Sequence, residues 1–231
     1  MKIDVKKSVL EANNELAAQL RAHWAERSTL AVNVISSPGS GKTALLEKTL
    51  PRLRGRWNIG VLVGDVQTEN DADRLAACGV PARQIITAGA CHLEAHTIRK
   101  HLPFVERDGL DLLIIENVGN LICPSSYDLG EDFKVVLLSV AEGEDKPLKY
   151  PGIFRRAKAA VITKIDLLPH TDFDLDLAER NIRSMHNGMD IFALSSRTGE
   201  GLDRWIDWLQ ERVREKQAGR AAAQRLQPDL P

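Results

Sequence analysis

Ser36-Ser37-Pro38-Gly39-Ser40-Gly41-Lys42-Thr43 is the stretch that decides the fold of this 231-residue chain. It follows an apolar run over 30–35 and opens a helix-like segment over 42–53, the context that a phosphate-binding loop requires. Its glycines let backbone N–H groups approach an anion, and the helix amino terminus adds partial positive charge. We expect Lys42 to reach the β- and γ-phosphates of a nucleotide and the Thr43 hydroxyl to ligate Mg²⁺.

The loop departs from the usual pattern at Ser36, where the first glycine normally stands, but its second half is intact. An ordinary strand-to-helix turn is the alternative interpretation, and the agreement of the later motifs disfavours it. The candidate nucleotide-binding residues of this loop are Gly39, Ser40, Gly41, Lys42, Thr43 and Ala44.

Strand-like and helix-like segments alternate on both sides of the loop. An amphipathic helix comes first, with apolar residues from Val9 to Trp24 at roughly helical spacing. Buried strands are predicted over 30–35, 59–63, 112–115, 135–140, 159–162 and 191–194, with helices over 42–53, 69–78 and 202–213. This alternation predicts an α/β P-loop fold with a mostly parallel sheet between helices. We expect one domain over 1–217 and a flexible tail over 218–231.

Composition excludes several classes of function. A formal net charge of −1 gives no bulk positive field for nucleic acid or an anionic membrane. Three cysteines do not form a disulfide framework and suit a reducing compartment. The sequence shows no signal peptide and no apolar run of the roughly 20 residues that span a bilayer. The expected location is the cytoplasm.

Two acids stand at the ends of predicted strands. Glu116 ends the 112–115 run and is followed by Asn-Val-Gly119, while Asp65 ends the 59–63 run. In a P-loop protein the strand that ends at Glu116 runs beside the loop strand, and such acids face Mg²⁺ or the attacking water. Either acid alone is more simply a helix cap or a solvated strand end, but behind the phosphate loop they are candidate magnesium ligands with Thr43. We therefore expect Lys42, Asp65 and Glu116 to be catalytic, and the Gly119 amide to sense the γ-phosphate.

The base is selected by a later motif, Thr163-Lys164-Ile165-Asp166, which resembles the Asn-Lys-x-Asp element of GTPases. One carboxylate accepts both N1–H and N2–H of guanine, whereas adenine has no N1–H and leaves it partly unpaired. The Lys164 stem can cover the base, and Ser195 lies in a run that resembles the loop closing a guanine pocket. Thr163 replaces the usual Asn, which leaves one supporting hydrogen bond in question. The pattern favours GTP over ATP.

A group of cysteine and histidine residues predicts a metal site. Cys91 and His92 open a predicted helix, on which His96 would share a face with His92, and Cys123 follows the Glu116 strand. Thiolate and imidazole suit Ni²⁺ or Zn²⁺, and the residue types do not choose between them. Spacing alone leaves these residues balanced between metal ligands and incidental residues. Cys78 has no neighbouring histidine and is interpreted as structural.

Five motifs occur in order: the phosphate loop, Gly-Asp-Val-Gln-Thr (64–68), Ala-Cys-His-Leu (90–93), Glu-Asn-Val-Gly-Asn-Leu-Ile-Cys-Pro (116–124) and Glu-Gly-Glu-Asp-Lys-Pro-Leu-Lys-Tyr-Pro (142–151). Together they resemble the nickel-insertion GTPase of NiFe-hydrogenase maturation, the HypB family, over nearly the whole chain. The urease-maturation relative usually carries Cys-Pro-His instead. Many HypB members also carry an amino-terminal cysteine motif or a histidine-rich tract, neither of which this sequence contains.

The resemblance implies a fold of the dimerising P-loop class that includes the signal-recognition and nitrogenase-iron-protein branches. It implies GTP-favoured homodimerisation and a metal site of Cys91, His92 and Cys123 at the dimer interface, with His96 as an addition. It also implies a hydrogenase-maturation protein and the hydrogenase large subunit as partners. Lys146 and Lys149 are either contacts to a nucleotide across the dimer or part of a solvated loop.

Three other functions stay open at this point. A urease-type or cobalamin-system metallochaperone GTPase would share the nucleotide motifs. A P-loop kinase would transfer phosphate to an acceptor. In a non-catalytic interaction module, nucleotide would only stabilise the structure. Hydrolysis restricted to GTP and its dependence on Lys42 distinguish among these functions.

Overall fold

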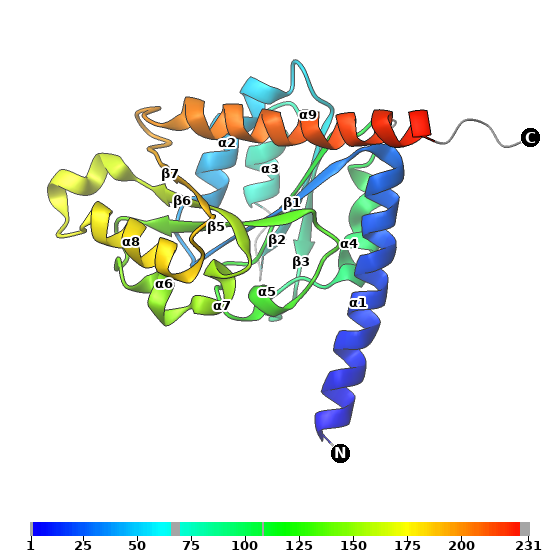
Figure 1. The fold of residues 1–231 in the computed structure, drawn as a ribbon, viewed down its shortest axis with the longest axis horizontal. Helices are drawn as coiled ribbons and strands as arrows, with labels where there is room; N and C mark the ends of the chain where they lie inside the picture. Colours follow the sequence, from blue (N-terminus) through cyan, green and yellow to red (C-terminus); the bar gives the residue numbers. More distant parts are fainter. Residues whose placement is uncertain (1, 66–69, 108, 227–231) are drawn as a thin grey trace, which may run out of the picture.

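The structure is a computed structural model that describes residues 2–65, 70–107 and 109–226, with the side chains of 2–8 and 220–226 excepted. Within these residues, seven parallel strands form one sheet in the order β3-β2-β4-β1-β5-β6-β7 (Figure 1). The strands are β1 (Leu30–Ser36), β2 (Ile59–Asp65), β3 (Ala82–Ile86), β4 (Leu112–Glu116), β5 (Phe133–Ser139), β6 (Ala157–Thr163) and β7 (Asp190–Ala193). The expected α/β fold with a parallel sheet is confirmed.

The register places the predicted acids beside the phosphate loop. β4 pairs with β1, with Glu116 opposite Val34, and with β2, with Glu116 opposite Val63. Parallel strands end at one edge of a sheet, so the carboxyl ends of β1, β2 and β4 meet there. The expectation that the Glu116 strand runs beside the loop strand is therefore confirmed.

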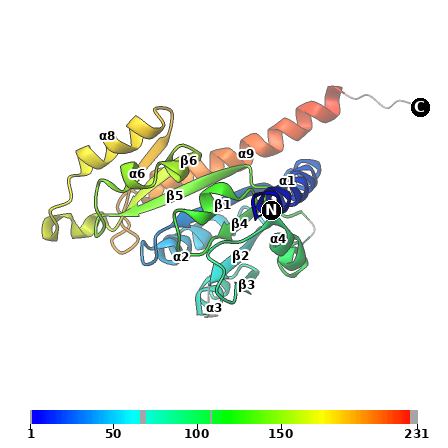
Figure 2. The ribbon, with the colours of Figure 1, turned by 90° about the horizontal axis from the view of Figure 1, so that it is seen from below.

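Helices cover both faces of the sheet. They are α1 (Lys2–Arg27), α2 (Lys42–Leu53), α3 (Asn70–Ala76), α4 (Ala95–His101), α5 (Cys123–Ser126), α6 (Lys146–Lys149), α7 (Pro151–Phe154), α8 (Leu175–Met185) and α9 (Leu202–Leu226), with short 3₁₀ turns at Leu102–Phe104 and Ile165–His170. In β1, Val32 and Val34 pack toward α2, α3 and α9, whereas Ala31 packs toward α1 and α4, and Ile35 toward α7 and α8. This alternation buries both faces. Figure 2 shows from below that helices lie on both sides of the sheet.

Two predictions about elements need correction. β3 was not expected, because only Ile85 of its residues is fully buried and the strand lies at the sheet edge, where apolar residues are few. The last helix was expected to end near Val213, before a flexible tail over 218–231. α9 instead continues to Leu226. The flexibility of 218–231 stays a prediction, and 227–231 lie outside the described residues.

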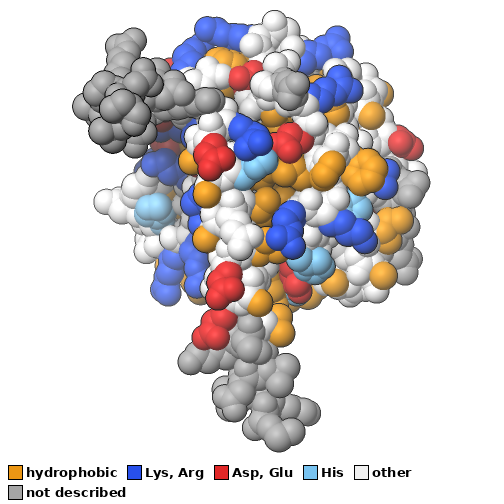
Figure 3. All heavy atoms as spheres, turned by 90° about the vertical axis from the view of Figure 1, so that its right-hand side faces the viewer, with side chains coloured by type: hydrophobic (Ala, Val, Ile, Leu, Met, Phe, Trp, Pro, Cys, Tyr) orange, Lys and Arg blue, Asp and Glu red, His pale blue; other side chains and the backbone are white. Residues whose placement is uncertain are grey.

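The side of the molecule that carries α1 and α4 mixes hydrophobic and basic side chains (Figure 3). Val9, Ile86 and Phe104 are large hydrophobic residues that remain exposed, and the Arg83 guanidinium lies over the Phe104 ring at 4.2 Å. No helix among the described residues is long and apolar enough to cross a membrane.

Candidate functional site

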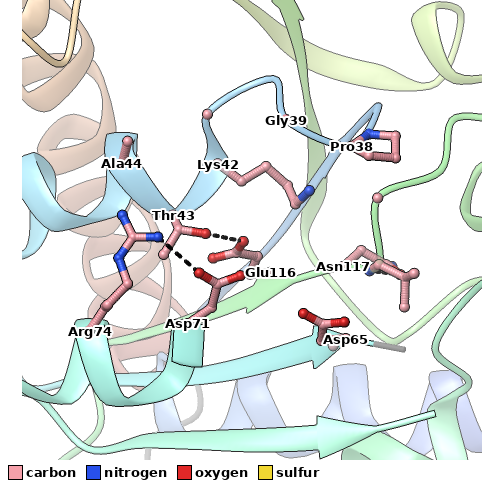
Figure 4. A pocket seen from close by; sticks show the side chains of 14 residues that line it. Pro38, Gly39, Lys42, Thr43, Ala44, Asp65, Asp71, Arg74, Glu116 and Asn117 are labelled. Atoms are coloured by element: carbon pink, nitrogen blue, oxygen red, sulfur yellow. Dashed lines mark hydrogen bonds and ion pairs between the residues drawn. The ribbon is translucent and has the colours of Figure 1, made fainter. Parts of the chain in front are cut away.

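The loop between β1 and α2 lines a cavity of about 410 Å³ (Figure 4). Gly39 and Gly41 have φ values of 73° and 94°, in the left-handed region that favours glycine. The loop thereby turns sharply into the amino terminus of α2, where backbone N–H groups without helical partners can face an anion. The remaining walls come from the ends of β2 and β4 and from α3.

The Lys42 side chain is buried beside the loop. Its Nζ donates a hydrogen bond to Ser36 Oγ at 3.1 Å, so the serine that replaces the usual glycine positions the lysine. Burial lowers the pKa of Lys42, and the negative charge of Glu116 opposes this effect. A phosphate at this point would restore the favourable environment of the ammonium group.

Thr43 and Glu116 meet across the cavity. Thr43 Oγ1 donates to Glu116 Oε1 at 2.8 Å, as Figure 4 shows, while Glu116 Oε2 is buried without a hydrogen-bond partner. Burial raises the pKa of Glu116 to about 7, although nearby Lys42 and the Thr43 hydrogen bond lower it. An unsatisfied buried carboxylate oxygen next to a hydroxyl suits a hard divalent cation such as Mg²⁺. The residues present therefore fit the predicted magnesium site.

Three further charged residues line the same cavity. Asp65 extends from the end of β2 toward it (Figure 4), and the motif residues 66–69 lie outside the described residues. Asp71 and Arg74 of α3, which sequence reasoning missed, also line it, and Arg74 Nη1 donates to Asp71 Oδ1 at 3.0 Å. Their i,i+3 spacing in the helix that follows Asp65 was the available signal.

Gly119 packs tightly against the phosphate loop. A Cβ atom at this position would lie 3.0 Å from Pro38 Cα, closer than side chains normally approach a backbone. Only glycine lets the segment after β4 come this near the loop. The predicted γ-phosphate sensor therefore lies against the loop that would hold the phosphates.

The guanine motif is joined to the phosphate loop by two hydrogen bonds. Thr163 Oγ1 donates to the Ser40 carbonyl at 2.7 Å, and Lys164 Nζ donates to the Gly39 carbonyl at 2.7 Å. Thr163 thus supplies a link between motif and loop even though it replaces the usual Asn. Asp166 Oδ1 accepts from Ser195 Oγ at 2.5 Å, so the two predicted base-pocket residues lie together.

The 142–150 segment lies beside the phosphate loop of its own chain. Lys146 Nζ lies 3.2 Å from Glu142 Oε1 and donates to Ser37 Oγ at 3.4 Å. Glu142 Oε2 accepts from Ser40 Oγ at 2.9 Å, a contact that sequence reasoning missed. Lys149 points to Asp145 instead, at 2.5 Å. Of the two lysines, Lys146 is the one that this structure brings to the loop.

Cys91, His92 and Cys123 form one cluster. Their candidate ligand atoms all lie within 4.8 Å of one another. The Cys91 and Cys123 sulfurs are 2.8 Å apart, and His92 Nδ1 lies 3.6 Å from Cys91 Sγ. Both thiols are free, and hydrogen bonding to Cys123 raises the pKa of Cys91. Two sulfurs and an imidazole nitrogen suit borderline-soft metals such as nickel and zinc.

The expected helical face of His92 and His96 is wrong. α4 begins at Ala95, so His92 lies in the turn before the helix and the i,i+4 argument does not apply. His96 is 65% exposed, and its Nδ1 lies 3.2 Å from Glu94 Oε2. Among the described residues, the compact cluster does not include it. His92 is instead held by stacking on Tyr127, with ring centroids 3.8 Å apart, and faces Glu94 Oε1 at 3.5 Å.

Comparisons with known proteins agree with this geometry. The family model described as "CobW/HypB/UreG, nucleotide-binding domain" matches residues 30–193. The hydrogenase maturation factor HypB of Escherichia coli K12 is 47% identical over 208 residues, 90% of this chain and 72% of the relative. The crystal structure of HypB from Helicobacter pylori in complex with nickel has a TM-score of 0.81 at 40% identity, covering 88% of this chain and 96% of that chain.

A more distant likeness concerns the fold alone. The GDP complex of the signal recognition particle 54 kDa protein from Aeropyrum pernix K1 has a TM-score of 0.54 at 12% identity, covering 85% of this chain and 50% of that chain. The predicted likeness to the signal-recognition branch of P-loop proteins is thus confirmed at the level of the fold.

Proposed function

This chain belongs to the HypB family of P-loop GTPases, and on that premise we propose that it hydrolyses GTP to drive nickel insertion during NiFe-hydrogenase maturation. The observation that carries the proposal is the segment 116–123. It begins at Glu116 in the candidate nucleotide pocket, the cavity around the phosphate loop, and ends at Cys123 in the cysteine–histidine cluster. One short connection thus joins the two sites.

Phosphoryl transfer requires positioning and charge neutralisation rather than a covalent protein intermediate. Lys42 and the amides of the phosphate loop stabilise charge that develops on the transferred group. Thr43 and Glu116 would hold Mg²⁺, which when bound would neutralise further charge on the phosphate oxygens. Asp65 binds the same ion or orients the attacking water. The orphaned Glu116 Oε2 and the pairing of Glu116 with Thr43 support these roles.

Asp166 selects guanine in this proposal. Its Oδ1 accepts the Ser195 hydrogen bond, and Arg197 Nη1 lies 3.9 Å from Oδ2. The carboxylate can still accept N1–H and N2–H of the base. The Lys164 stem covers the base, and its ammonium bond to the Gly39 carbonyl holds it beside the phosphate loop.

Nickel is the cargo of the cysteine–histidine cluster. The cluster offers three donor side chains, and a structural or transfer site for such a metal commonly takes a fourth ligand. Cys91 is exposed, and Ile122, which precedes Cys123, is 63% exposed, so the cluster is accessible from the surface. In this proposal a second copy of the chain, bound when GTP is present, supplies the remaining ligand. A hydrogenase-maturation protein and the hydrogenase large subunit then receive the metal.

Replacing Lys42 with alanine tests the enzymatic part of the proposal. Because Lys42 neutralises transition-state charge, we expect a loss of about 10²- to 10³-fold in the rate of phosphate release from GTP. ATP should be hydrolysed far more slowly than GTP by the unaltered chain. Lys48→Ala, at an exposed position of the same helix, is the matched control and should retain the rate. Hydrolysis that survives Lys42→Ala, or equal turnover of ATP and GTP, contradicts the proposal.

A further inference from the structure

The Asn120 side chain joins the two segments that carry the clustered cysteines. Its Nδ2 donates to the Cys91 carbonyl at 3.1 Å, and its Oδ1 accepts from the Ile122 amide at 2.8 Å. Ile122 immediately precedes Cys123. A single amide group therefore bridges the 90–93 turn and the start of α5, which are otherwise distant in the sequence.

Asn120 also lies next to the part of the chain that contacts the phosphate loop. Its neighbour Gly119 packs closely on the loop, because a Cβ atom there would lie only 3.0 Å from Pro38 Cα. A displacement of Pro38 would therefore act directly on the backbone at Gly119. The adjoining residue, Asn120, is the first whose side chain reaches the cluster.

A second asparagine anchors the start of the same segment. Asn117 is buried, and its Oδ1 accepts from the Val118 amide at 2.9 Å and the Leu93 amide at 3.4 Å. Its Nδ2 donates to Asn33 Oδ1 in β1 at 3.2 Å. This buried end is fixed to the sheet, so the part of the segment free to respond lies beyond it, at Gly119 and Asn120.

We propose that Asn120 is a positioning residue that couples nucleotide state to metal affinity by making the Cys91 turn follow movements of the 119–123 segment. This inference rests on the proposed function, because it concerns regulation of the same metal site. Cys123 is linked to Gly119 through the backbone, whereas Cys91 is not. The Leu93–Asn117 hydrogen bond ties the Cys91 turn to the fixed end of the segment. The Asn120 hydrogen bond ties the Cys91 carbonyl to the part beyond Gly119, so both thiols respond to one movement.

The chemistry of the amide explains why an asparagine suits this position. One side chain must donate to a carbonyl and accept from an N–H, and only an amide of this length offers both in fixed geometry. Asn120→Asp keeps the acceptor for Ile122 and removes the donor for Cys91. Asn120→Ala removes both bonds and is the second variant, in case the added charge impairs folding.

The test measures Ni²⁺ dissociation constants of the full chain with GDP and with a slowly hydrolysed GTP analogue. Allosteric coupling typically changes affinity by about 5- to 150-fold, and we expect the unaltered chain to fall in that range. In both Asn120 variants the ratio of the two Ni²⁺ dissociation constants should fall to below about 2-fold, which is less than the typical range of allosteric coupling. GTP hydrolysis without metal should be retained, since Asn120 does not touch the pocket. By reciprocity, the effect of Ni²⁺ on nucleotide affinity should shrink equally.

Asn58→Asp is the matched control, because Asn58 Nδ2 also donates to an exposed carbonyl, that of Gly109 at 3.0 Å, and should leave the ratio unchanged. An unchanged ratio in both folded Asn120 variants overturns this inference while the proposed function stands. Weaker Ni²⁺ binding by the same factor in both nucleotide states also overturns it, since that shows a purely structural role. A ratio of 1 in the unaltered chain overturns the proposed coupling of GTP hydrolysis to metal transfer together with this inference.

Discussion

The candidate nucleotide pocket and the cysteine–histidine cluster are built in different ways. Lys42, Thr43 and Glu116 are each less than 10% exposed and sit at the ends of helices and strands inside the fold. Cys91 is exposed and lies in a turn, and Cys123 stands at the start of the short helix α5. The pocket is therefore positioned by the core, whereas the cluster depends on a few hydrogen bonds such as those of Asn120. We expect the cluster to be the part that changes with nucleotide state.

Removing a thiol tests whether the two regions separate functionally. Cys91→Ser or Cys123→Ser removes a thiolate ligand, so the loss of Ni²⁺ affinity should exceed the roughly 10- to 100-fold that follows loss of an outer-shell partner. GTP hydrolysis without metal should be retained, because neither cysteine lines the candidate nucleotide pocket. Isothermal titration and a phosphate-release assay measure the two effects.

Cys78→Ser is the control for these variants. Cys78 lies beyond the end of α3 and packs against the core, and it is absent from the described metal cluster. Its replacement should leave Ni²⁺ affinity unchanged. Equal loss of affinity in Cys78→Ser, or none in the Cys91 and Cys123 variants, is incompatible with the assigned site.

Glu116 gives a pH-dependent test of the pocket. Burial raises its pKa from 4.5 to about 7, so without nucleotide and Mg²⁺ the folded chain holds this proton more tightly than the unfolded chain. The free energy of unfolding should therefore fall as pH rises between about 4.5 and 7, by up to about 3 kcal/mol from this group. The glutamine in Glu116→Gln does not titrate. The free energy of unfolding of this variant, relative to that of the unaltered chain, should therefore rise as pH rises from about 4.5 to 7.

Urea unfolding at several pH values measures that difference, in which the contributions of titrating groups that do not interact with Glu116 cancel. If the stability difference does not change between pH 4.5 and 7, the raised pKa of the buried Glu116 carboxyl group is contradicted. Added Mg²⁺ and GDP should reduce the trend in the unaltered chain, because a bound cation favours the ionised carboxylate.

The smallest expected effect concerns Thr163. Its hydroxyl donates to the Ser40 carbonyl inside the protein, so Thr163→Val should cost about 1 kcal/mol, or about 5-fold in GDP affinity. Thr163→Ser retains the hydroxyl and is the matched control. Fluorescent-nucleotide displacement measures both variants. If valine and serine behave alike, the hydrogen bond does not support the pocket.

Local motifs with strict chemistry were predictable from the sequence. The phosphate loop requires its glycines, and once that loop identified a P-loop protein, the Glu116 strand was expected beside the loop strand. Both expectations agree with the structure. The hydrogen bond from Thr163, which stands where GTPases usually have Asn, to the Ser40 carbonyl was not predictable, because it depends on the distance between two loops.

Other features depend on tertiary placement and could not be derived from spacing. β3 carries the polar pair Arg83 and Gln84, so its pattern does not stand out from a loop. α4 begins at Ala95, so His92 lies outside the helix. This was not predictable, because helix boundaries are the least reliable part of a sequence pattern. The approach of Lys146 to Ser37 joins residues far apart in the chain.

The central claim is that nucleotide state and nickel affinity are linked. The most direct measurement is the Ni²⁺ dissociation constant of the full chain with GDP and with a slowly hydrolysed GTP analogue, with the oligomeric state recorded in the same samples. The account predicts affinities that differ by at least about 5-fold and a reciprocal change in nucleotide affinity when Ni²⁺ is present. Equal Ni²⁺ affinities in the two states, with dimerisation measured, would contradict it.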